Sequence, residues 1–385
     1  MTDLYAYQAA ITAGGTVVVP PGTYTLSQPL LLPQDTAVTL DGYGATVALD
    51  AACPGGLLEF ASSEDYQTFR NITTRGFAID ASLVTADYNN QAVIGTTRLG
   101  THSGVTWMNY LHDILIQDMD ITLPPSLTAV EDYDIRHTGV YLCSRQSSTS
   151  TPENDVEVKH ITVRNVTVSG GESGIVIAAA RGYGAALCDE NGAPLTPWAG
   201  NHVWMDAINV IDCHHFPTQP ADDYLPWNGI HVGSVAHGGS VLVSGCGSEG
   251  AGDSNIEVNG FADTVIEHCT MTDSAAISFL IHNFNDRVDP SAQTILFNDC
   301  HAVNTGPLVY HQGGTWNRQG FRASSGYGTD IGAVSFVNCT SSTYSEGNDF
   351  FTEAVSSVSY SDTPPMTRKQ LYAETSEQVG GEYDR

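Results

Sequence analysis

The chain contains very little positive charge. Its 385 residues include 43 Asp and Glu against 14 Lys and Arg, and the only lysines are Lys159 and Lys369. The formal net charge of -29 argues against nucleic acid or anionic lipid as a partner, because both repel an acidic surface. Such a surface tolerates concentrated salt, where the Debye length is about 3 Å at 1 M. The composition is therefore typical of an acidic extracellular or viral protein, or of a protein from a salt-loving (halophilic) source.

The chain also lacks any long apolar run and any recognisable leader. No segment approaches the roughly 18 consecutive apolar residues that indicate a transmembrane helix, so no membrane insertion is expected. The first ten residues, MTDLYAYQAA, do not combine a basic region with a following apolar region, which is the pattern of a secretory signal. A virion protein needs no such signal, because it leaves its cell by lysis. We therefore expect an extracellular protein or a virion component.

No pattern of metal-ligating residues stands out. The sequence has no Cys-x-x-Cys pair and no cluster of cysteine with histidine, so neither a metal nor another cofactor is expected. Helical periodicity is almost absent as well, which predicts a chain built from β-strands. With 41% apolar residues the chain can form a sizeable core, either in two ordinary domains or in one large all-β domain.

A short alternating strand recurs along the chain. In each copy the strand is followed by a polar or glycine turn residue and then by cysteine or another apolar residue. Self-similarity at periods of about 20 to 50 residues is typical of solenoids. The apolar residue after the turn falls at positions 77, 119, 166, 213, 246, 269, 300 and 339.

A second strand follows most of these copies, and two or three short strands per repeat predict a parallel β-helix. We place the second strand at 139–143, 174–178, 229–233, 255–259, 279–283 and 307–311. Stacked coils would bury one inward column of cysteines. We expect free, buried thiols there and not disulfides, because stacked Cβ vectors run parallel. The column contains Cys213, Cys246, Cys269, Cys300 and Cys339.

The N-terminal stretch carries a family resemblance. Residues 7–48 contain QAAI, a strand ending in PPGTY and a further strand after a Leu-Pro turn, and this order resembles the start of the pectate-lyase-like right-handed parallel β-helix superfamily. The coils to about residue 354 continue the likeness. The resemblance implies an all-β fold, a single-stranded right-handed parallel β-helix with an N-terminal capping helix. The superfamily includes polysaccharide lyases, glycoside hydrolases, epimerases and viral tailspikes, so the fold does not identify the reaction.

The sequence departs from the better-known members of that superfamily. Of the Asn-Thr-Asp, Asp-Asp, Gly-His-Gly and Arg-Ile-Lys motifs of polygalacturonases, only the pair Asp222-Asp223 occurs, and it lies in an inserted loop. The Trp-Ile-Asp-His signature of calcium pectate lyases is missing too. We therefore expect neither of these two enzyme types.

The two ends of the chain differ from the coils. Residues 1–354 are expected to form the β-helix, with an N-terminal cap at about 1–15 whose helix is capped by the side chain of Thr2 or Asp3. Residues 355–385 are expected to be a tail that covers the last coil, mediates oligomer contacts or is partly disordered. A homotrimer is expected only by analogy with tailspikes.

Alignment of the second strands places polar residues in shared outward columns. His231 and Glu257 occupy the same position on neighbouring coils, about 4.8 Å apart, so their side chains should hydrogen-bond. We call the surface formed by these columns the polar ribbon and expect it to be exposed. The column of His231 and Glu257 also contains Tyr141, Val176, Leu280 and Val309. The other columns contribute Glu172, Trp227 and Asp253 on one side and Asn259, His282 and His311 on the other, and Tyr224 lies nearby in the sequence.

The polar ribbon suits a polysaccharide, because aromatic rings stack on sugar faces while carboxylates and amides bind hydroxyl groups. Any acidic β-helix, however, exposes polar side chains and places some carboxylates side by side by chance. If the ribbon does bind a glycan, the substrate-binding residues are expected to be Trp227, Tyr224, Tyr141, Asn259, His282 and His311.

Two catalytic schemes are compatible with the polar ribbon. Glu172 and Asp253 lie two coils apart, about 9.6 Å from the strand spacing. Inverting glycosidases separate their two carboxyl groups by roughly 6.5–9.5 Å to admit a water molecule. Alternatively, Glu257 and His231 form an acid/base couple in which the carboxylate raises the pKa of the histidine.

A polysaccharide lyase would need a base and cationic groups beside a uronate. Arg145, Arg181 and Arg287 each follow a second strand by a few residues and are expected to line one edge of the ribbon. Because the chain has only two lysines, a histidine or a tyrosine would have to act as the base. A hydrolase or a pure binder is therefore favoured over a lyase.

The sequence thus predicts a tailspike-like protein that binds, and hydrolyses, a host cell-surface polysaccharide. One alternative is a secreted polysaccharide lyase, hydrolase or epimerase of a cellular organism. The other is a non-catalytic structural or adhesin β-helix of a virion. The expected partners are a cell-surface glycan and other virion proteins, with no role for nucleic acid.

Overall fold

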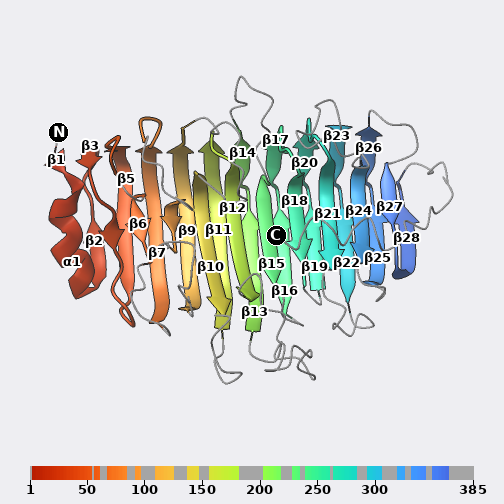
Figure 1. Cartoon of the computed structure of the whole chain (residues 1–385), viewed down its shortest axis with the longest axis horizontal. Helices are drawn as coiled ribbons and strands as arrows, with labels where there is room; N and C mark the ends of the chain where they lie inside the picture. The colour runs from red at the N-terminus through yellow and green to blue at the C-terminus, as the bar shows by residue number, and fades with distance from the viewer. Residues whose placement is uncertain are drawn as a thin grey trace, which may run out of the picture.

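The structure is a computed structural model, in which most of the chain forms one stack of parallel strands (Figure 1). The description below covers residues 2–53, 56–60, 67–84, 92–96, 109–124, 137–146, 156–181, 203–217, 228–234, 239–260, 263–283, 293–305, 319–325, 331–343 and 349–363.

A short cap begins the stack. It consists of β1 (Thr2–Asp3), the 3-10 helix η1 (Leu4–Tyr7) and α1 (Gln8–Ala13). The Asp3 carboxylate accepts a hydrogen bond of 2.9 Å from the backbone N–H of Tyr5 and so caps the first turn, as predicted. Leu4 and Ile11 are fully buried and close the first coil. No helix in the described ranges is long and apolar enough to span a membrane.

The first sheet has 18 strands, and all of its pairs are parallel. Its early strands are long and bend around a corner of the coil, whereas later coils divide the same path into a strand and a shorter strand. The undivided strands are β5 (Val38–Leu49), β7 (Gln67–Asp80), β9 (Asn109–Thr122) and β11 (Val156–Ser169), preceded by β2 (Gly15–Val18) and β3 (Gly22–Leu26).

From residue 203 onward the first sheet consists of two sets of strands. The first set is β13 (Val203–Ile211), β16 (Ser240–Ser244), β19 (Asp263–Glu267), β22 (Thr294–Asn298), β25 (Ile331–Val337) and β28 (Val355–Ser361). The second set, called the short strands below, is β14 (His214–Phe216), β17 (Gly247–Glu249), β20 (Thr270–Thr272), β23 (His301–Thr305) and β26 (Thr340–Thr343).

The second sheet has 10 strands and carries the polar ribbon. Its strands are β4 (Leu30–Leu31), β6 (Leu58–Glu59), β8 (Ala92–Gly95), β10 (Thr138–Gln146), β12 (Ser173–Arg181), β15 (Ile230–Ser234), β18 (Ser254–Asn259), β21 (Ile277–Asn283), β24 (Gln319–Ser325) and β27 (Phe350–Thr352). Two stacked parallel sheets with one N-terminal helix confirm the predicted parallel β-helix.

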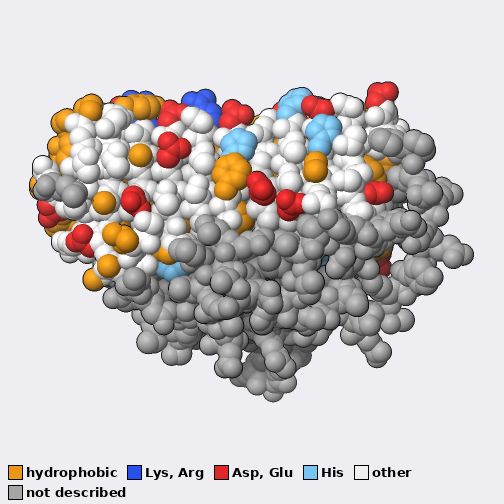
Figure 2. Space-filling view, turned by 90° about the horizontal axis from the view of Figure 1, so that it is seen from above, with side chains coloured by type: hydrophobic (Ala, Val, Ile, Leu, Met, Phe, Trp, Pro, Cys, Tyr) orange, Lys and Arg blue, Asp and Glu red, His pale blue; other side chains and the backbone are white. Residues whose placement is uncertain are grey.

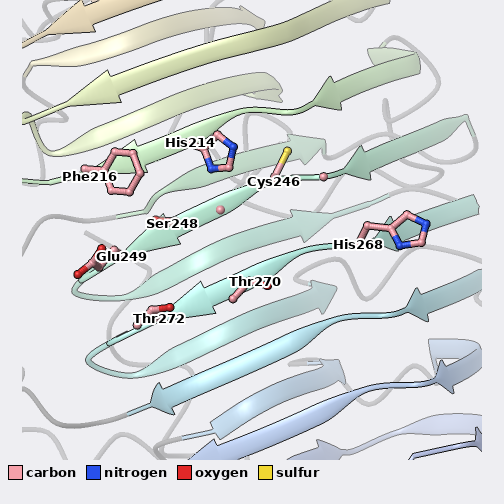
Figure 3. A pocket seen from close by; sticks show the side chains of 10 residues that line it. His214, Phe216, Cys246, Ser248, Glu249, His268, Thr270 and Thr272 are labelled. Atoms are coloured by element: carbon pink, nitrogen blue, oxygen red, sulfur yellow. The ribbon is translucent and has the colours of Figure 1, made fainter.

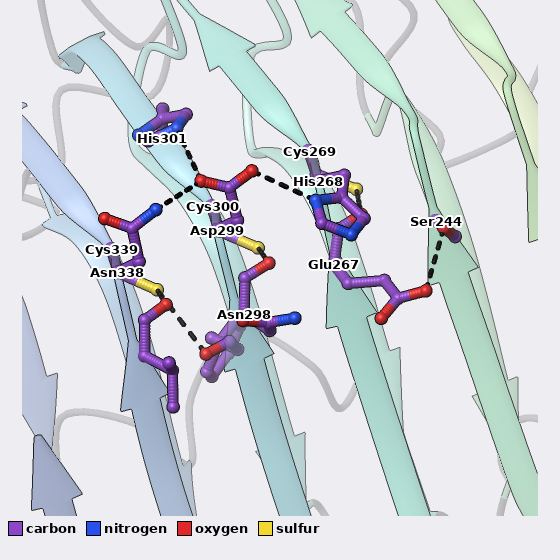
Figure 4. Close-up of polar contacts among 12 residues, drawn as sticks. Ser244, Glu267, His268, Cys269, Asn298, Asp299, Cys300, His301, Asn338 and Cys339 are labelled. Carbon is purple, nitrogen blue, oxygen red and sulfur yellow. Dashed lines mark hydrogen bonds and ion pairs between the residues drawn. The ribbon is translucent and has the colours of Figure 1, made fainter. Parts of the chain in front are cut away.

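A column of left-handed residues makes the corner between the two sets of strands. Asp and Asn tolerate this backbone conformation better than other residues with a side chain, because they hydrogen-bond locally. Their side chains also bond from coil to coil: Asn165 donates to Asp118 at 2.8 Å, and Asn338 donates to Asp299 at 2.6 Å. We call this column the turn ladder (Figure 4); its members are Asp118, Asn165, Asp212, Gly245, His268, Asp299 and Asn338, with φ between 51° and 66°.

Directly after the turn ladder comes the predicted inward column. All five of its cysteines are buried and free, so the prediction of buried thiols is confirmed. Each thiol donates to backbone carbonyl groups; the Cys269 thiol, for example, lies 3.1 Å from the Glu267 oxygen and the Cys300 thiol 3.2 Å from the Ile266 oxygen. Burial, reinforced by the neighbouring thiols, raises the pKa of Cys246 well above its usual value. The cysteines therefore act as small core residues.

One strand of the second sheet was predicted at the wrong residues. The strand that pairs with β21 is β24, and not residues 307–311, which lie outside the described ranges. Phe321 of β24 stacks on Phe279 of β21 with ring centroids 4.6 Å apart, and Phe350 continues the column at 4.8 Å. This aromatic column sets the register of the last coils. Arg322 and Ser324 therefore hold the positions that the sequence assigned to Val309 and His311.

The coils also extend beyond the boundary predicted at residue 354. β28 pairs with β25 over Val355–Ser361 and forms the last described strand of the first sheet. Residues 364–385, the greater part of the predicted tail, lie outside the described ranges.

Candidate functional site

Strand register brings His231 and Glu257 together. Both point away from the core from neighbouring strands, and His231 is the direct partner of Glu257 in the pairing of β15 with β18. The predicted outward column runs from Tyr141 through Val176 to these two residues and on to Leu280, as the pairings of β10, β12, β15, β18 and β21 require. The predicted side-by-side placement of His231 and Glu257 is therefore confirmed.

The Glu257 carboxylate is held by three donors. Its Oε2 accepts a hydrogen bond of 2.7 Å from the Asn228 amide and lies 3.0 Å from His231 Nδ1, while its Oε1 accepts one of 3.0 Å from the Asn259 amide. The Asn228 oxygen in turn accepts from Ser254, from the backbone N–H at 3.2 Å and from the hydroxyl at 2.9 Å. Only 6% of the Glu257 side chain is exposed. Its position is therefore rigid, with both oxygens engaged.

The His231 ring is fixed in orientation. Because a carboxylate can only accept, the 3.0 Å contact with Glu257 places a proton on Nδ1, and when the ring is neutral Nε2 is the acceptor. Nε2 lies over Gly233, and a Cβ at that position would be 2.5 Å from it. The side chain of His231 is 23% exposed, more than that of its partner. The accessible group of this pair is thus the imidazole and not the carboxylate.

His231 and Glu257 each favour the charged form of the other, and this attraction outweighs the cost of burying the two charges. Burial lowers the pKa of His231, but Glu257 and Asp253 outweigh it, so that the pKa is raised above 6.5. Burial raises the pKa of Glu257, but His231 and the Asn228 amide outweigh it, so that the pKa is lowered below 4.5. Glu257 therefore remains a carboxylate at neutral pH and cannot serve as a proton donor there.

The second carboxylate pair of the prediction lies at the corner where the strands of the second sheet begin. Glu172 directly precedes β12 and Asp253 directly precedes β18, and β15 lies between the two strands. The register thus keeps them two coils apart, about 9.6 Å at the usual strand spacing. Both are buried. Their role as an acid and a base stays a prediction.

Most of the described polar ribbon is buried, so the prediction of an exposed surface is wrong. Glu172, Asp253, Glu257 and His282 are each largely covered, while His231, Asn259 and Tyr141 are half-buried. Alternation along a strand distinguishes inward from outward side chains, but it does not reveal what packs over the outward ones. At Glu257 the covering groups include the amides of Asn228 and Asn259.

The coils after β18 add a second histidine and a cation. Burial and the charge of Arg322 lower the pKa of His282 to about 3, so this imidazole is neutral. Arg322 donates from Nε to the Ser324 hydroxyl at 2.9 Å, and its guanidinium carbon lies 5.3 Å from the centre of the Phe351 ring. Asn228 and Arg322 were not predicted from the sequence. The asparagine precedes a glycine at the strand start, and the arginine was missed because the strand was placed at 307–311.

Several of the predicted residues, or their side chains, lie outside the described part of the structure. Trp227, Tyr224, His311 and Arg287 lie outside the described ranges. Arg145 and Arg181 lie in β10 and β12, but their side chains are not among those described. Within the described ranges, no group of three or more His, Cys, Asp or Glu side chains is arranged to hold a metal ion.

Comparisons with known proteins add little to this geometry. No family model and no curated protein matches the chain. Among solved structures, the chain is similar to the catalytic unit of a GH87 α-1,3-glucanase from Streptomyces thermodiastaticus strain HF3-3, with 13% identity, a TM-score of 0.44 and coverage of 97% of this chain and 68% of that one.

Two further solved structures are similar over almost their whole length. The A-module of the mannuronan C-5 epimerase AlgE6 from Azotobacter vinelandii has 13% identity, a TM-score of 0.35 and coverage of 95% of this chain and 96% of that one. The Streptococcus pneumoniae surface protein and adhesin PfbA has 12% identity, a TM-score of 0.31 and coverage of 94% and 96%. At these values the function has to be argued from the site itself.

Proposed function

We propose that the chain is a polysaccharide-active enzyme in which His231 acts as the general base. The observation that carries this proposal is the 3.0 Å contact between His231 Nδ1 and a carboxylate that three donors hold in place. In catalytic histidines a carboxylate often binds one ring nitrogen and so orients the imidazole. The other ring nitrogen is then free to take up a proton during catalysis. Glu257 is then a positioning residue.

The reaction class that fits one oriented base is β-elimination from a uronate. His231 Nε2 takes the proton from the carbon beside the sugar carboxyl, the electron pair of that C–H bond forms a C=C bond, and the adjacent glycosidic C–O bond breaks. The leaving oxygen keeps the electron pair and takes a proton to become a new chain end. An epimerase begins with the same abstraction and returns a proton to the opposite face of the carbon.

A cation on the same sheet supports an anionic substrate. Arg322 lies three strands beyond His231 in the same outward column, about 14 Å away at the usual strand spacing. At that separation Arg322 would bind a carboxylate on a sugar further along the polymer and not that of the reacting sugar. Because the net charge of the chain is -29, an anionic polysaccharide should bind better as salt screens the repulsion.

Hydrolysis is the second candidate, and the placement of Glu172 and Asp253 two coils apart favours it. Their separation of about 9.6 Å at strand spacing is near the upper edge of the roughly 6.5–9.5 Å of inverting glycosidases. In that case Glu172 and Asp253 would share the acid and base roles, and His231 would only help to bind the substrate. The two candidates form different products.

The experiment compares uronate-containing and neutral polysaccharides as substrates, measuring both reducing ends and the ultraviolet absorbance of an unsaturated product. Wild type is assayed beside His231→Gln, Glu172→Gln and His160→Gln; His160 is an exposed histidine that contacts Asp113 at the same 3.0 Å. We expect ultraviolet-absorbing product from wild type and His160→Gln, and a loss of about 10²-fold or more in His231→Gln.

The other outcomes are equally informative. Reducing ends without absorbance, abolished by Glu172→Gln and kept by His231→Gln, would replace the lyase proposal by hydrolysis. Retained glycan binding with no turnover of any substrate would contradict an enzyme and leave a tailspike-like or adhesin β-helix.

A further inference from the structure

A second candidate site lies on the short strands, on the sheet that does not carry the polar ribbon. An open groove of about 240 Å³ runs across β14, β17 and β20 (Figure 3). Figure 2 shows the upper face of the molecule in Figure 1, toward which the short strands lie, with acidic and histidine side chains along it. The stretch GCGS, residues 245–248, forms the floor of the groove.

Glycine opens the groove. Gly247 of β17 pairs with His214 of β14 on one side and with Thr270 of β20 on the other. A Cβ on Gly247 would lie 2.7 Å from His214 Nδ1, so the glycine leaves room for that ring. The middle strand therefore carries no outward side chain at this point, and a trough forms between its two neighbours.

One wall of the groove is aromatic. Phe216 is 45% exposed although it is a large apolar residue. Its ring and that of His214 are inclined by only 7°, with centroids 6.2 Å apart, so they form two nearly parallel plates on one strand. Figure 3 shows both rings along the edge of the groove. An exposed aromatic plate beside a trough is suited to contact with the C–H face of a ring.

The remaining wall is polar and available. In the described part of the chain, the side chains of Glu249, Thr270 and Thr272 make no hydrogen bond, although all three line the groove. The adjacent turn ladder is different, since Asp299 there is engaged by both His268 and Asn338. The groove thus combines an aromatic plate with one carboxylate acceptor and two hydroxyl groups.

We propose that this groove is a non-catalytic carbohydrate-binding subsite that holds one pyranose ring. The ring would stack on Phe216, and its hydroxyl groups would bond to Glu249, Thr270 and Thr272. The volume of about 240 Å³ is below the roughly 300–1,000 Å³ of sites for drug-sized ligands, which suits one sugar ring and not an extended chain. Because the groove and the polar ribbon are on different sheets, one polymer segment would bind here while the active site works on another.

The test is saturation-transfer NMR on the full chain with the methyl glycosides of glucose, galactose and mannose at millimolar concentration. We expect wild type to transfer saturation to at least one glycoside. In Phe216→Ala the dissociation constant should be about tenfold larger, and Phe216→Tyr should restore the wild-type affinity. Gly247→Val keeps Phe216 but fills the trough and displaces the His214 ring, and it should also weaken binding. Trp204→Ala is the matched control, since Trp204 is an exposed aromatic residue elsewhere on the same sheet.

The outcomes separate this subsite from the proposed catalytic site. His231→Gln should keep the saturation signal, whatever its effect on turnover. A signal that Phe216→Ala leaves unchanged and Trp204→Ala or His231→Gln removes would place the bound sugar elsewhere and overturn the subsite. An absence of signal for all three glycosides with folded wild-type protein would overturn it as well.

Discussion

Two histidine–carboxylate pairs in this molecule have the same length and different surroundings. His231 Nδ1 lies 3.0 Å from Glu257 on the second sheet, and His268 Nδ1 lies 3.0 Å from Asp299 on the turn ladder (Figure 4). In both pairs the pKa of the histidine is raised and that of the acid is lowered. The side chains of the second pair, however, are 58% and 37% exposed, against 23% and 6% in the first.

Burial gives the two pairs different consequences. On the turn ladder, water and salt screen the charges, and such a pair adds little to stability. In the polar ribbon, three donors surround the Glu257 carboxylate in a region of low dielectric, so the loss of this acceptor leaves polar groups without a partner. The same contact stabilises a turn on the turn ladder, whereas in the polar ribbon it holds a preorganised site.

The largest expected effect is on activity. Glu257→Gln removes the charge that raises the pKa of His231 while burial, which lowers it, remains. We expect kcat/KM to fall by about 10²-fold or more, and its rise with pH, which reports deprotonation of the base, to move to lower pH. Asp299→Asn should change neither the rate nor the profile. An unshifted profile in Glu257→Gln would show that His231 is not the titrating base.

Substitutions of Glu257 and Asp299 should also differ in their effect on the free energy of unfolding. Glu257→Ala leaves the donors of Asn228, His231 and Asn259 unpaired in a buried region, and we expect a loss of about 3 kcal/mol in the free energy of unfolding. Asp299→Asn, which keeps a residue suited to the left-handed backbone, should behave as an ordinary exposed substitution. Urea denaturation of both variants, with the m-values compared, measures the difference. Equal losses would contradict the role given to burial.

A third histidine sharpens the comparison, because it is buried and has no carboxylate partner among the described residues. His215 contacts the Gly170 oxygen at 3.1 Å, and burial lowers its pKa to about 4. Below pH 6.5 the unfolded chain takes up a proton that the folded chain refuses, so stability should fall as the pH drops toward 4. The slope is about 1.4 kcal/mol per pH unit, or about 3 kcal/mol in all.

The measurement is urea denaturation between pH 7 and pH 4 for wild type, His215→Met and His160→Gln. His215→Met should reduce the slope without abolishing it, because burial also lowers the pKa of His282 to about 3, whereas His160→Gln, at an exposed histidine, should follow wild type. A wild-type profile unchanged by His215→Met would show that other groups cause the acid sensitivity.

The smallest expected effect tests orientation alone. In Gly233→Ala the new Cβ would lie 2.5 Å from His231 Nε2, so the ring must turn away. We expect kcat to fall about tenfold with little change in KM or in the denaturation midpoint, because misplacement of a catalytic group costs rate and not binding. A parallel rise in KM would indicate a general distortion of the site.

Part of the site was predictable because strand alternation and repeat spacing are local patterns. Aligning the segments around Ile230 and Ile256 is enough to place His231 beside Glu257, and the pairing of β15 with β18 confirms it. The same alignment failed two coils later, where residues 307–311 also alternate. There the stacked rings of Phe279 and Phe321 decide the register, and alternation alone contains no information about them.

By itself, then, the sequence determined the parallel β-helix, the inward cysteine column and the pairing of one histidine with one glutamate. These follow from period-two alternation and from a turn residue that repeats in every coil. Only the tertiary structure decided that Glu257 is buried under the Asn228 amide, that Arg322 joins the outward column and that glycine opens a groove on the opposite sheet. The physical reason is that burial and cavities depend on which coils stack and which side chains meet across them, and those contacts join residues far apart in the chain.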